Sequence, residues 1–386
     1  MKLIVILPRF PYPTEKGDKL RAFNQLKILS RHHSIYLCAI THQKVDESQL
    51  SAVKPFCKEI RVIRQGWFAV AWNLTRALFS GLPFQAGYYY SGRAHNTIRQ
   101  IINKVQPDHI YCQLLRTAAY AMEESIPKTI DFQDVFSKGI ERRIPLAGFF
   151  MRPVLKLEYR RLLKYESLIF DSFDNKTIIS KPDRDFIPHP GRDQILIVPN
   201  GVDHEYFRPE QRAQTHELIF TGNMGYPPNI NCAEYLAKKV LPIIHKTAPG
   251  VRMMLAGASP HSRVKALASE SVTVTGWVDD LRTCYASASV FLAPMQIGTG
   301  LQNKLLEAMS MQLPCVTSSL CNFALNAHPG KEILIGDTPE AVAEHVLNLL
   351  HDEDFRYRIA KEGYNFVQRN YSWEGATRGL IQILGS

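Results

Sequence analysis

Short apolar runs recur along the chain and alternate with longer segments whose apolar residues are spaced as in a helix. In the first helical segment these residues are Leu20, Phe23, Leu26 and Leu29. The runs that predict buried strands lie at residues 3–7, 34–40, 59–63, 109–112, 128–131, 194–198, 217–221, 252–256, 273–276, 289–294 and 315–318. Because strands that alternate with helices favour a parallel, doubly wound sheet, the pattern predicts the α/β class.

The same rhythm starts again near residue 200, after a turn at residues 199–203. A chain of 386 residues is long enough for two or three domains. We therefore expect two Rossmann-like, doubly wound domains that face a central cleft, with the first at residues 1–195 and the second at residues 196–370. Neither half has a G-x-G-x-x-G motif after its first strand, which disfavours a dehydrogenase site.

A glycine turn, Gly298-Thr299-Gly300, follows the predicted strand at residues 289–294 and precedes a run of strong helix formers. A helix that begins after such a turn directs free backbone N–H groups at a phosphate. Lys304 and Glu307 lie three residues apart and share one helix face. The ammonium could meet phosphate and the carboxylate could accept from ribose hydroxyls. An ordinary strand–turn–helix with a surface Lys and Glu explains the local pattern equally well.

A second candidate site lies near the N-terminus, where a proline-rich loop ends at Gly17 before a helix. The cations of this region are Arg9, Lys16, Lys19 and Arg21. Ligands of doubly wound sheets bind beyond the carboxyl ends of the strands, which is where Gly17 and residues 131–134 are expected.

Charge is unevenly distributed along the chain. Residues 1–200 carry 30 Lys and Arg against 18 Asp and Glu, a balance of +12, whereas residues 201–386 carry 16 against 18, a balance of −2. A basic half predicts an anionic partner, which could be nucleic acid, an acidic membrane surface or a phosphorylated substrate. A solvated basic surface is the alternative.

Two segments of the first half, at residues 66–82 and 144–164, are both apolar and basic. Each is too short or too charged to span a bilayer, but both fit binding at a membrane interface. Core-facing helices with a basic solvent side would have the same composition.

The seven cysteines are scattered and form no C-x-x-C motif, so we expect neither a disulfide framework nor a zinc site. The chain runs from Met1-Lys2 directly into a predicted strand, which predicts no signal peptide. These features favour a cytoplasmic protein, with peripheral binding to the cytoplasmic face of the membrane as an added hypothesis.

Several motifs together resemble glycosyltransferase family 4, whose members are retaining enzymes with the GT-B fold. In the second half these motifs are 199–203, 207–209, 276–281, 300–309 and 314–316, and in the first half they are the loop to Gly17, 83–91, 131–134 and 159–166. The first-half motifs resemble the sugar transferases of exopolysaccharide systems. The similarity covers essentially the whole chain and is most specific in the second half. Residues 371–386 resemble the last helix of the family, which crosses back to the N-terminal domain.

The resemblance implies a role for each matching residue. Glu307 matches the glutamate that binds the donor's ribose, and Gly17 matches the flexible loop between acceptor and diphosphate. Gly300, Leu301 and Gln302 match the positions that face the diphosphate and donor sugar. The glycine turn adds Gly298 and Thr299 to the expected donor-binding residues. The loop that contacts the base contains Trp277 and Val278. On the acceptor side the corresponding residues are Arg9, Arg21, Asp131, Gln133 and Asp134.

The chain also departs from the family pattern. Thr299 occupies the position of the first glutamate of the E-x7-E motif, and Gln133 stands where a histidine is common. Both basic residues of the diphosphate clamp are absent, because the clamp positions fall on 222–223 and Pro228. Lys304 is our candidate replacement, with Arg9 or Arg21 as possible contributors from the other domain.

The combined expectation is transfer of a sugar from a UDP- or GDP-linked donor to a saccharide or lipid-linked acceptor with retention of configuration and without a metal cofactor. Catalytic roles are assigned to Gly17, Lys304 and Glu307. A non-catalytic binding or scaffold subunit of the same fold is the main alternative, because the clamp is missing. A nucleotide-sugar 2-epimerase lacks a convincing set of acidic and histidine residues, and no base-reading motif supports a nucleic-acid-binding protein.

Overall fold

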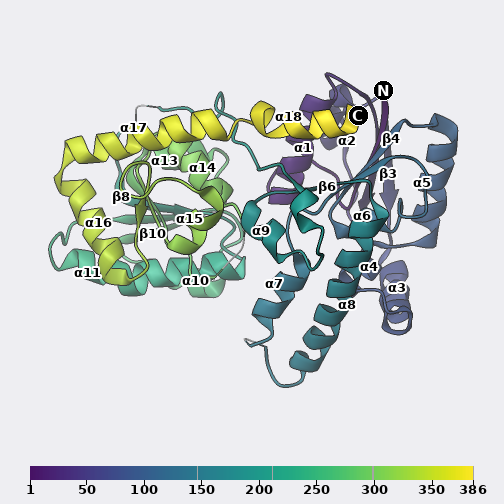
Figure 1. Ribbon diagram of the computed structural model, residues 1–386. Coiled ribbons are helices and arrows are strands. Elements are labelled where there is room, and N and C mark those ends of the chain that lie inside the picture. The colour runs from purple at the N-terminus through teal and green to yellow at the C-terminus, as the bar shows by residue number, and fades with distance from the viewer. Residues whose placement is uncertain (146, 211, 298–299, 386) are drawn as a thin grey trace. The chain divides into compact units, whose positions relative to one another are not determined.

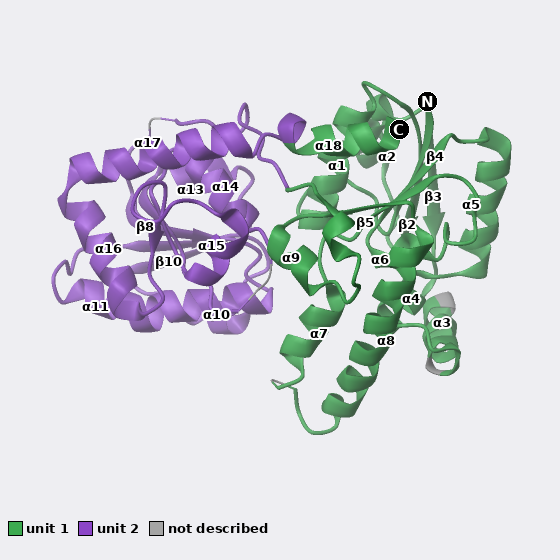
Figure 2. Ribbon diagram, viewed as in Figure 1, with its two compact units in different colours: residues 1–199, 376–386 green, residues 200–375 purple. Residues whose placement is uncertain are grey.

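The computed structural model describes residues 1–145, 147–210, 212–297 and 300–385 (Figure 1). The chain divides into two compact units (Figure 2). Unit 1 contains residues 1–199 and 376–386, and unit 2 contains residues 200–375. The two units are described separately below.

Unit 1 is built on a parallel sheet in the order β3-β2-β1-β4-β5-β6-β7. Its strands are β1 (Lys2–Leu7), β2 (Ser34–Thr41), β3 (Glu59–Arg64), β4 (His109–Gln113), β5 (Lys128–Asp131), β6 (Asn175–Ile178) and β7 (Leu196–Ile197). The central strand β1 pairs with β2 through Leu3 and Ile35, and with β4 through Leu3 and His109. Because the chain order reverses between β1 and β4, this unit is doubly wound, and the predicted α/β class is confirmed.

The helices of unit 1 connect these strands and cover both faces of the sheet. They are α1 (Gly17–Leu29), α2 (Glu47–Val53), α3 (Trp67–Ser80), α4 (Phe84–Tyr89), α5 (Gly92–Val105), α6 (Leu115–Ala118), α7 (Phe136–Arg143), α8 (Met151–Ser172) and α9 (Lys181–Phe186), with 3-10 turns at Lys54–Phe56 and Arg192–Gln194. The C-terminal helix α18 (Trp373–Gly385) begins in unit 2 and joins unit 1 from Ala376 onwards.

Alternate residues of β1 face two different hydrophobic cores. Ile4 and Ile6 pack in a core that includes α5 and α8, whereas Leu3, Val5 and Leu7 pack in a core that includes α1 and α18. Strand side chains point alternately to the two faces, and a sheet covered on both faces requires apolar residues at every position. This burial explains why the β1 sequence is a continuous apolar run.

Unit 2 is built on a second parallel sheet, in the order β10-β9-β8-β11-β12-β13. Its strands are β8 (His216–Thr221), β9 (Met253–Ala256), β10 (Val272–Gly276), β11 (Ala288–Ala293), β12 (Cys315–Thr317) and β13 (Leu334–Ile335). Its helices are α10 (Pro227–Tyr235), α11 (Leu241–His245), α12 (Ser262–Lys265), α13 (Leu281–Ala286), α14 (Asn303–Ser310), α15 (Ser319–Leu325), α16 (Pro339–His351) and α17 (Glu353–Asn370), with a π-helical turn at Leu236–Val240. The pair α14 and α17 packs on one face, and α11 packs with α16 on the other (Figure 1).

The chain enters and leaves unit 2 through two segments that run side by side. Val202 forms a parallel bridge with Ser372, and its N–H donates to the carbonyl of Tyr371 at 2.8 Å. A Cβ atom at Gly201 would lie 2.5 Å from the backbone nitrogen of Trp373, so only glycine allows this approach.

Most predicted strands are found at or within a few residues of their predicted bounds. The sequence prediction missed β6 and β13. Among the described residues, no helix is both long and apolar enough to cross a membrane.

Candidate functional site

In unit 2 the chain order reverses between β8 and β11, which makes the carboxyl ends of these strands the expected ligand position. Gly222 follows β8 with a φ of +150°, and Gly257 follows β9 with a φ of +143°. A Cβ atom at Gly257 would lie 1.9 Å from the carbonyl oxygen of Gly222. Two glycines therefore keep the backbone close packed and free of side chains at this edge.

Lys304 extends from the first turn of α14 toward this glycine edge. Its Nζ donates to Asn229 Oδ1 at 2.6 Å and lies 4.4 Å from the centre of the Phe220 ring. A Cβ atom at Gly222 would lie 3.0 Å from the same Nζ. Burial lowers the pKa of Lys304 to about 8. In the part of the chain that the structure describes, no carboxylate forms an ion pair with this ammonium.

Glu307 lies on the same face of α14, one turn further on. Its Oε2 accepts a hydrogen bond from the Tyr285 hydroxyl at 2.8 Å, and that hydroxyl is also 2.8 Å from Thr221 Oγ1 at the end of β8. Burial raises the pKa of the Glu307 carboxyl. Lys304 and Glu307 therefore lie on one helix face, as predicted, and both side chains are half-buried.

The segment before α14 contains the predicted donor-facing positions. Gly298 and Thr299 lie outside the described residues. Gly300 has a φ of +73°, a conformation that favours glycine, and Leu301 is buried. Gln302 precedes the helix without a side-chain cap, and the N–H of Leu305 bonds to its carbonyl at 3.0 Å.

The predicted base-contacting loop follows β10. The Trp277 side chain is 62% exposed, and its Nε1 donates to Asp279 Oδ1 at 3.0 Å. Val278 is half-buried. The indole is thus presented to solvent at the carboxyl end of the sheet, where its face is available for stacking.

In unit 1, the loop after β1 carries two of the predicted residues. Arg9 donates from Nη1 to Asp18 Oδ2 at 2.5 Å. Gly17 is exposed and is the first residue of α1, whose N-cap residue Lys16 makes no side-chain capping bond. The predicted glycine helix start is therefore present.

Arg21 and Asp131 correct an expectation. Both side chains are fully buried and form two hydrogen bonds, from Nε to Oδ2 at 2.7 Å and from Nη2 to Oδ1 at 3.0 Å. Tyr111 and Thr177 donate to the same carboxylate at 3.1 and 2.9 Å. The pair fastens α1 to the sheet, so Arg21 is a structural cation and not a ligand-facing one.

The other predicted acceptor-side residues follow β5. Gln133 is buried with a φ of 61°, and its Nε2 has no hydrogen-bond acceptor among the described residues. Asp134 Oδ1 accepts from the N–H of Val135 at 2.8 Å. The strained backbone and unsatisfied amide mark this turn as a binding candidate.

Sequence reasoning missed several residues of these sites, namely Thr221, Asn229, Gly257, Tyr285 and Arg116. Gly257 carried a readable signal, because it directly follows a predicted strand. Thr221 ends strand β8, whereas Asn229, Tyr285 and Arg116 come from separate helices, which only the fold brings to the strand ends. The described residues contain no group of three or more His, Cys, Asp and Glu side chains arranged to hold a metal ion.

Comparisons with known proteins agree with this geometry. Residues 215–352 match the family model described as Glycosyl transferases group 1. The chain is 21% identical to an "Uncharacterized 44.6 kDa protein in cps region" of Klebsiella pneumoniae, over 96% of each chain. Among solved structures, sucrose-phosphate synthase of Thermosynechococcus elongatus has a TM-score of 0.71 at 14% identity, covering 99% of this chain and 98% of that one. HepE of Anabaena, solved with UDP and glucose, has a TM-score of 0.69 at 11% identity, covering 99% of both chains. The chain has the GT-B fold of two Rossmann-like units, and its second unit carries the match to the glycosyl transferase family model.

Proposed function

We propose that the chain transfers a sugar from a nucleotide-diphosphate donor to a saccharide or lipid-linked acceptor, with retention of configuration, in the synthesis of exopolysaccharide or another cell-surface glycan. The observation that carries the proposal is the pair Lys304 and Glu307 beside the glycine edge at the ends of β8 and β9. The family match over residues 215–352 and the cps-region relative support it.

Each donor-site residue has a distinct role in this proposal. The Lys304 ammonium offsets the charge of the diphosphate, with help from backbone N–H groups before α14. The Glu307 carboxylate accepts from the ribose hydroxyls, and Trp277 stacks on the base. The Gly222 and Gly257 backbone lets the diphosphate approach closely because no Cβ atom intervenes.

The proposed reaction breaks the bond between the sugar's anomeric carbon and the diphosphate oxygen while the acceptor oxygen bonds to the same face of that carbon. The acceptor's proton passes to the departing phosphate oxygen, so the protein supplies no separate base. Negative charge grows on the diphosphate in the transition state, and Lys304 stabilises it there. We propose that this ammonium stabilises the departing diphosphate without a divalent metal cofactor.

A thermal-shift and calorimetric titration with UDP, GDP and ADP tests the donor site, with EDTA or magnesium present. One diphosphate should stabilise the wild-type protein regardless of magnesium, by about 2.7 kcal/mol at a hundredfold excess over its Kd. Glu307→Gln should bind that nucleotide about tenfold more weakly, because it loses a charge-assisted ribose contact. Glu344→Gln, an exposed carboxylate on α16, is the matched control.

No binding of any nucleotide by the wild-type protein would contradict the transferase and favour a non-catalytic scaffold. Binding without release of nucleoside diphosphate from its sugar conjugate, in the presence of candidate acceptors, would favour the same alternative.

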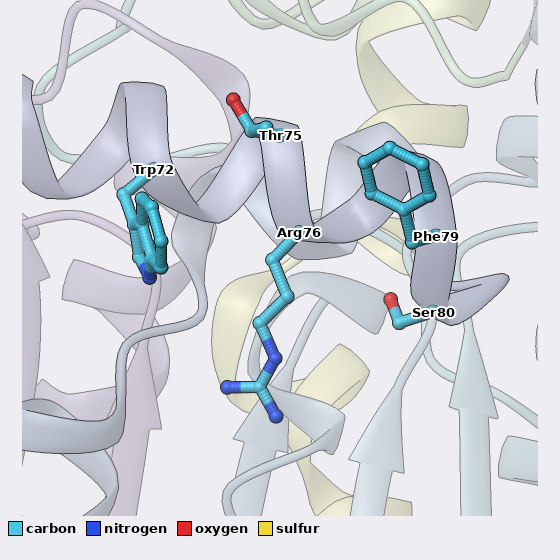
Figure 3. A pocket seen from close by; sticks show the side chains of 5 residues that line it. All are labelled: Trp72, Thr75, Arg76, Phe79 and Ser80. Carbon is cyan, nitrogen blue, oxygen red and sulfur yellow. The ribbon is translucent and has the colours of Figure 1, made fainter.

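A second observation favours docking of unit 1 on an anionic membrane. Helix α3 exposes large aromatic side chains, with Phe68 95% exposed, Trp72 73% and Phe79 87%. Figure 3 shows Trp72, Arg76 and Phe79 projecting from this helix. Together with Thr75 and Ser80 they line a surface hollow of about 410 Å³. Residues 60–107 contain six Lys and Arg and no Asp or Glu. Three of these cations form ion pairs, Arg61 and Lys104 with Glu59 and Arg99 with Glu124, whereas the exposed Arg76 of α3 forms none among the described residues. Exposed aromatics beside this arginine fit an interface of anionic lipids, and we propose that occupant.

Vesicle flotation tests this docking. The wild-type protein should float with vesicles that contain anionic phospholipid and less with neutral ones. The triple variant Phe68→Ser, Trp72→Ser, Phe79→Ser should stay in the soluble fraction while keeping its nucleotide affinity. Tyr357→Ser, which alters an exposed aromatic of unit 2, serves as the control. Equal flotation with anionic and neutral vesicles would contradict the proposal. So would flotation of the triple variant to the same extent as the wild-type protein.

A further inference from the structure

Unit 1 has a cavity of about 380 Å³ that the donor site does not use. It is lined by Arg9, Leu74, Phe84, Gln85, Tyr88, Tyr89 and Arg116. Arg9 follows β1, and Arg116 lies in α6 just after β4. The chain order of the sheet reverses between these two strands, so the cavity lies at the position where doubly wound sheets bind ligands.

Arg116 presents a guanidinium that the described residues satisfy only in part. Its Nη2 donates to Gln85 Oε1 at 2.9 Å, and its Cζ lies 4.9 Å from the Tyr89 ring centre and 4.8 Å from that of Phe136. Its Nε is buried and has no hydrogen-bond acceptor. No carboxylate of the described chain lies within ion-pair distance of it, and Asp18 and Asp134 act on this guanidinium only from further away.

Arg9 brings a second guanidinium to the same cavity. Asp18 accepts one of its N–H groups at 2.5 Å, and this ion pair fixes the side chain. The Tyr89 hydroxyl also interacts with this guanidinium. Because a guanidinium carries five N–H groups, donors remain for a further acceptor. The residues that line the cavity thus include two cations and no carboxylate.

The aromatic wall of the cavity is held in place from two sides. The carbonyl of Tyr89 accepts from Tyr120 Oη at 2.6 Å and from Gln65 Nε2 at 2.8 Å. Glu158 of α8 accepts from the N–H groups of Phe84 and Gln85 at 2.8 and 3.0 Å, which fixes the start of α4. A preorganised aromatic wall beside cations suits a sugar ring that carries negative charge.

We propose that this cavity, through Arg9 and Arg116, binds an oxyanion carried by the acceptor saccharide, either a phosphate ester or a carboxylate. The inference rests on the proposed transferase function, since it names the chemical class of that enzyme's second substrate. Guanidinium groups bind both oxyanions by paired N–H donors, and the aromatic wall contacts the attached sugar. Leu74 belongs to α3, so the cavity also adjoins the helix proposed to contact lipid.

Equilibrium dialysis tests the cavity, with labelled inorganic phosphate, glucose 1-phosphate, glucuronate and glucose as probes. The nucleotide site is first saturated with UDP, so that a phosphate probe does not occupy it. At least one charged sugar should bind ten or more times tighter than glucose, and its identity separates a phosphate from a carboxylate acceptor. Arg116→Gln and the more exposed Arg9→Gln should each weaken that binding about tenfold.

Arg99→Gln, an exposed arginine of α5, is the matched control and should bind as the wild-type protein does. Equal binding of charged and neutral sugars, or unchanged binding in both cavity variants, would overturn the inference. So would a parallel loss of UDP affinity in those variants, because the cavity would then serve the donor. Absence of binding of UDP, GDP and ADP alike in the wild-type protein contradicts the proposed function separately, while arginine-dependent binding of the charged sugar is still measured.

Discussion

The ammonium of Lys304 lies beside an amide, an aromatic ring and a glycine, with no ion-pair partner among the described carboxylates. Removing a charged group from water is unfavourable, and burial lowers the pKa of Lys304 although the Glu307 carboxylate acts in the opposite direction. A bound diphosphate would provide the missing anion. The residue is therefore better explained by ligand binding than by stability of unit 2.

This pKa predicts how nucleotide affinity varies with pH. With a pKa of about 8 in the folded protein, Lys304 is charged at pH 7 and largely neutral at pH 9. We expect the affinity for the nucleoside diphosphate to fall by up to tenfold across that range. Lys304→Met should bind about tenfold more weakly at pH 7 and show a flatter pH profile, measured by calorimetry.

The exposed Lys331→Met is the control for that titration and should keep the wild-type profile. The stability of the unliganded protein depends on pH in the opposite direction to the nucleotide affinity. Between pH 8 and the ordinary lysine pKa of 10.5, the unfolded chain binds more protons at this position than the folded one. The contribution of Lys304 to the free energy of unfolding therefore rises with pH in that window. Equal pH profiles of Lys304→Met and wild type would rule out the proposed role.

Arg21 shows the contrasting use of a buried cation. Its charge is matched by Asp131, and two hydroxyls complete the carboxylate's hydrogen bonds. Removing one partner of such a pair typically costs about 3–5 kcal/mol, because the other charge stays buried. Sequence alone placed Arg21 and Lys304 in the same class of candidate, and only their partners separate them.

At the scale of elements, the sequence predicted strands where both faces of a strand are buried. The β1 and β11 segments are continuous apolar runs because helices cover both faces of their sheets. The short strands β6 and β13 lack this signal. β6 contains the polar Asn175 and Lys176 at its half-buried start, and β13 has only two residues. Tertiary pairing, not local pattern, makes them strands.

The same reasoning explains which site residues could be predicted. Lys304 and Glu307 share one helix, so their spacing alone places them on one face. Asn229 and Tyr285 belong to other helices, and their approach to α14 depends on how those helices pack. The place of Arg116 at the ligand-binding edge of the sheet follows from the order of the strands, which no local sequence pattern contains. Side chains within one element are therefore predictable, whereas those from different elements require the fold.

At the scale of the whole molecule, the chain leaves unit 1 at residue 199, builds unit 2, and returns to unit 1 at residue 376. Inside unit 1, Leu380 and Leu384 of α18 are almost fully buried with residues of β1 and α1. Gly379 lies against Leu196, where an added Cβ atom would be 3.1 Å from its side chain. Residues 376–385 thus belong to unit 1 and contribute Leu380 and Leu384 to its core, although they follow unit 2 in sequence.

This return predicts that α18 stabilises unit 1 without contributing to nucleotide affinity. Leu380→Ala should lower the free energy of unfolding of unit 1 by about 2–5 kcal/mol, because it removes a fully buried side chain and leaves a cavity. Gln382→Ala, an exposed position on the same helix, should change it little. Hydrogen exchange measured by mass spectrometry would locate the effect of Leu380→Ala. Exchange should be faster than in the wild-type protein in peptides of β1 and α1 and unchanged in peptides of β8 and α14. Calorimetry should give the same UDP affinity for both variants, since Lys304 and Glu307 belong to unit 2. Faster exchange confined to unit 2 would show that the helix acts on the donor site instead. A loss of UDP affinity in Leu380→Ala would show the same.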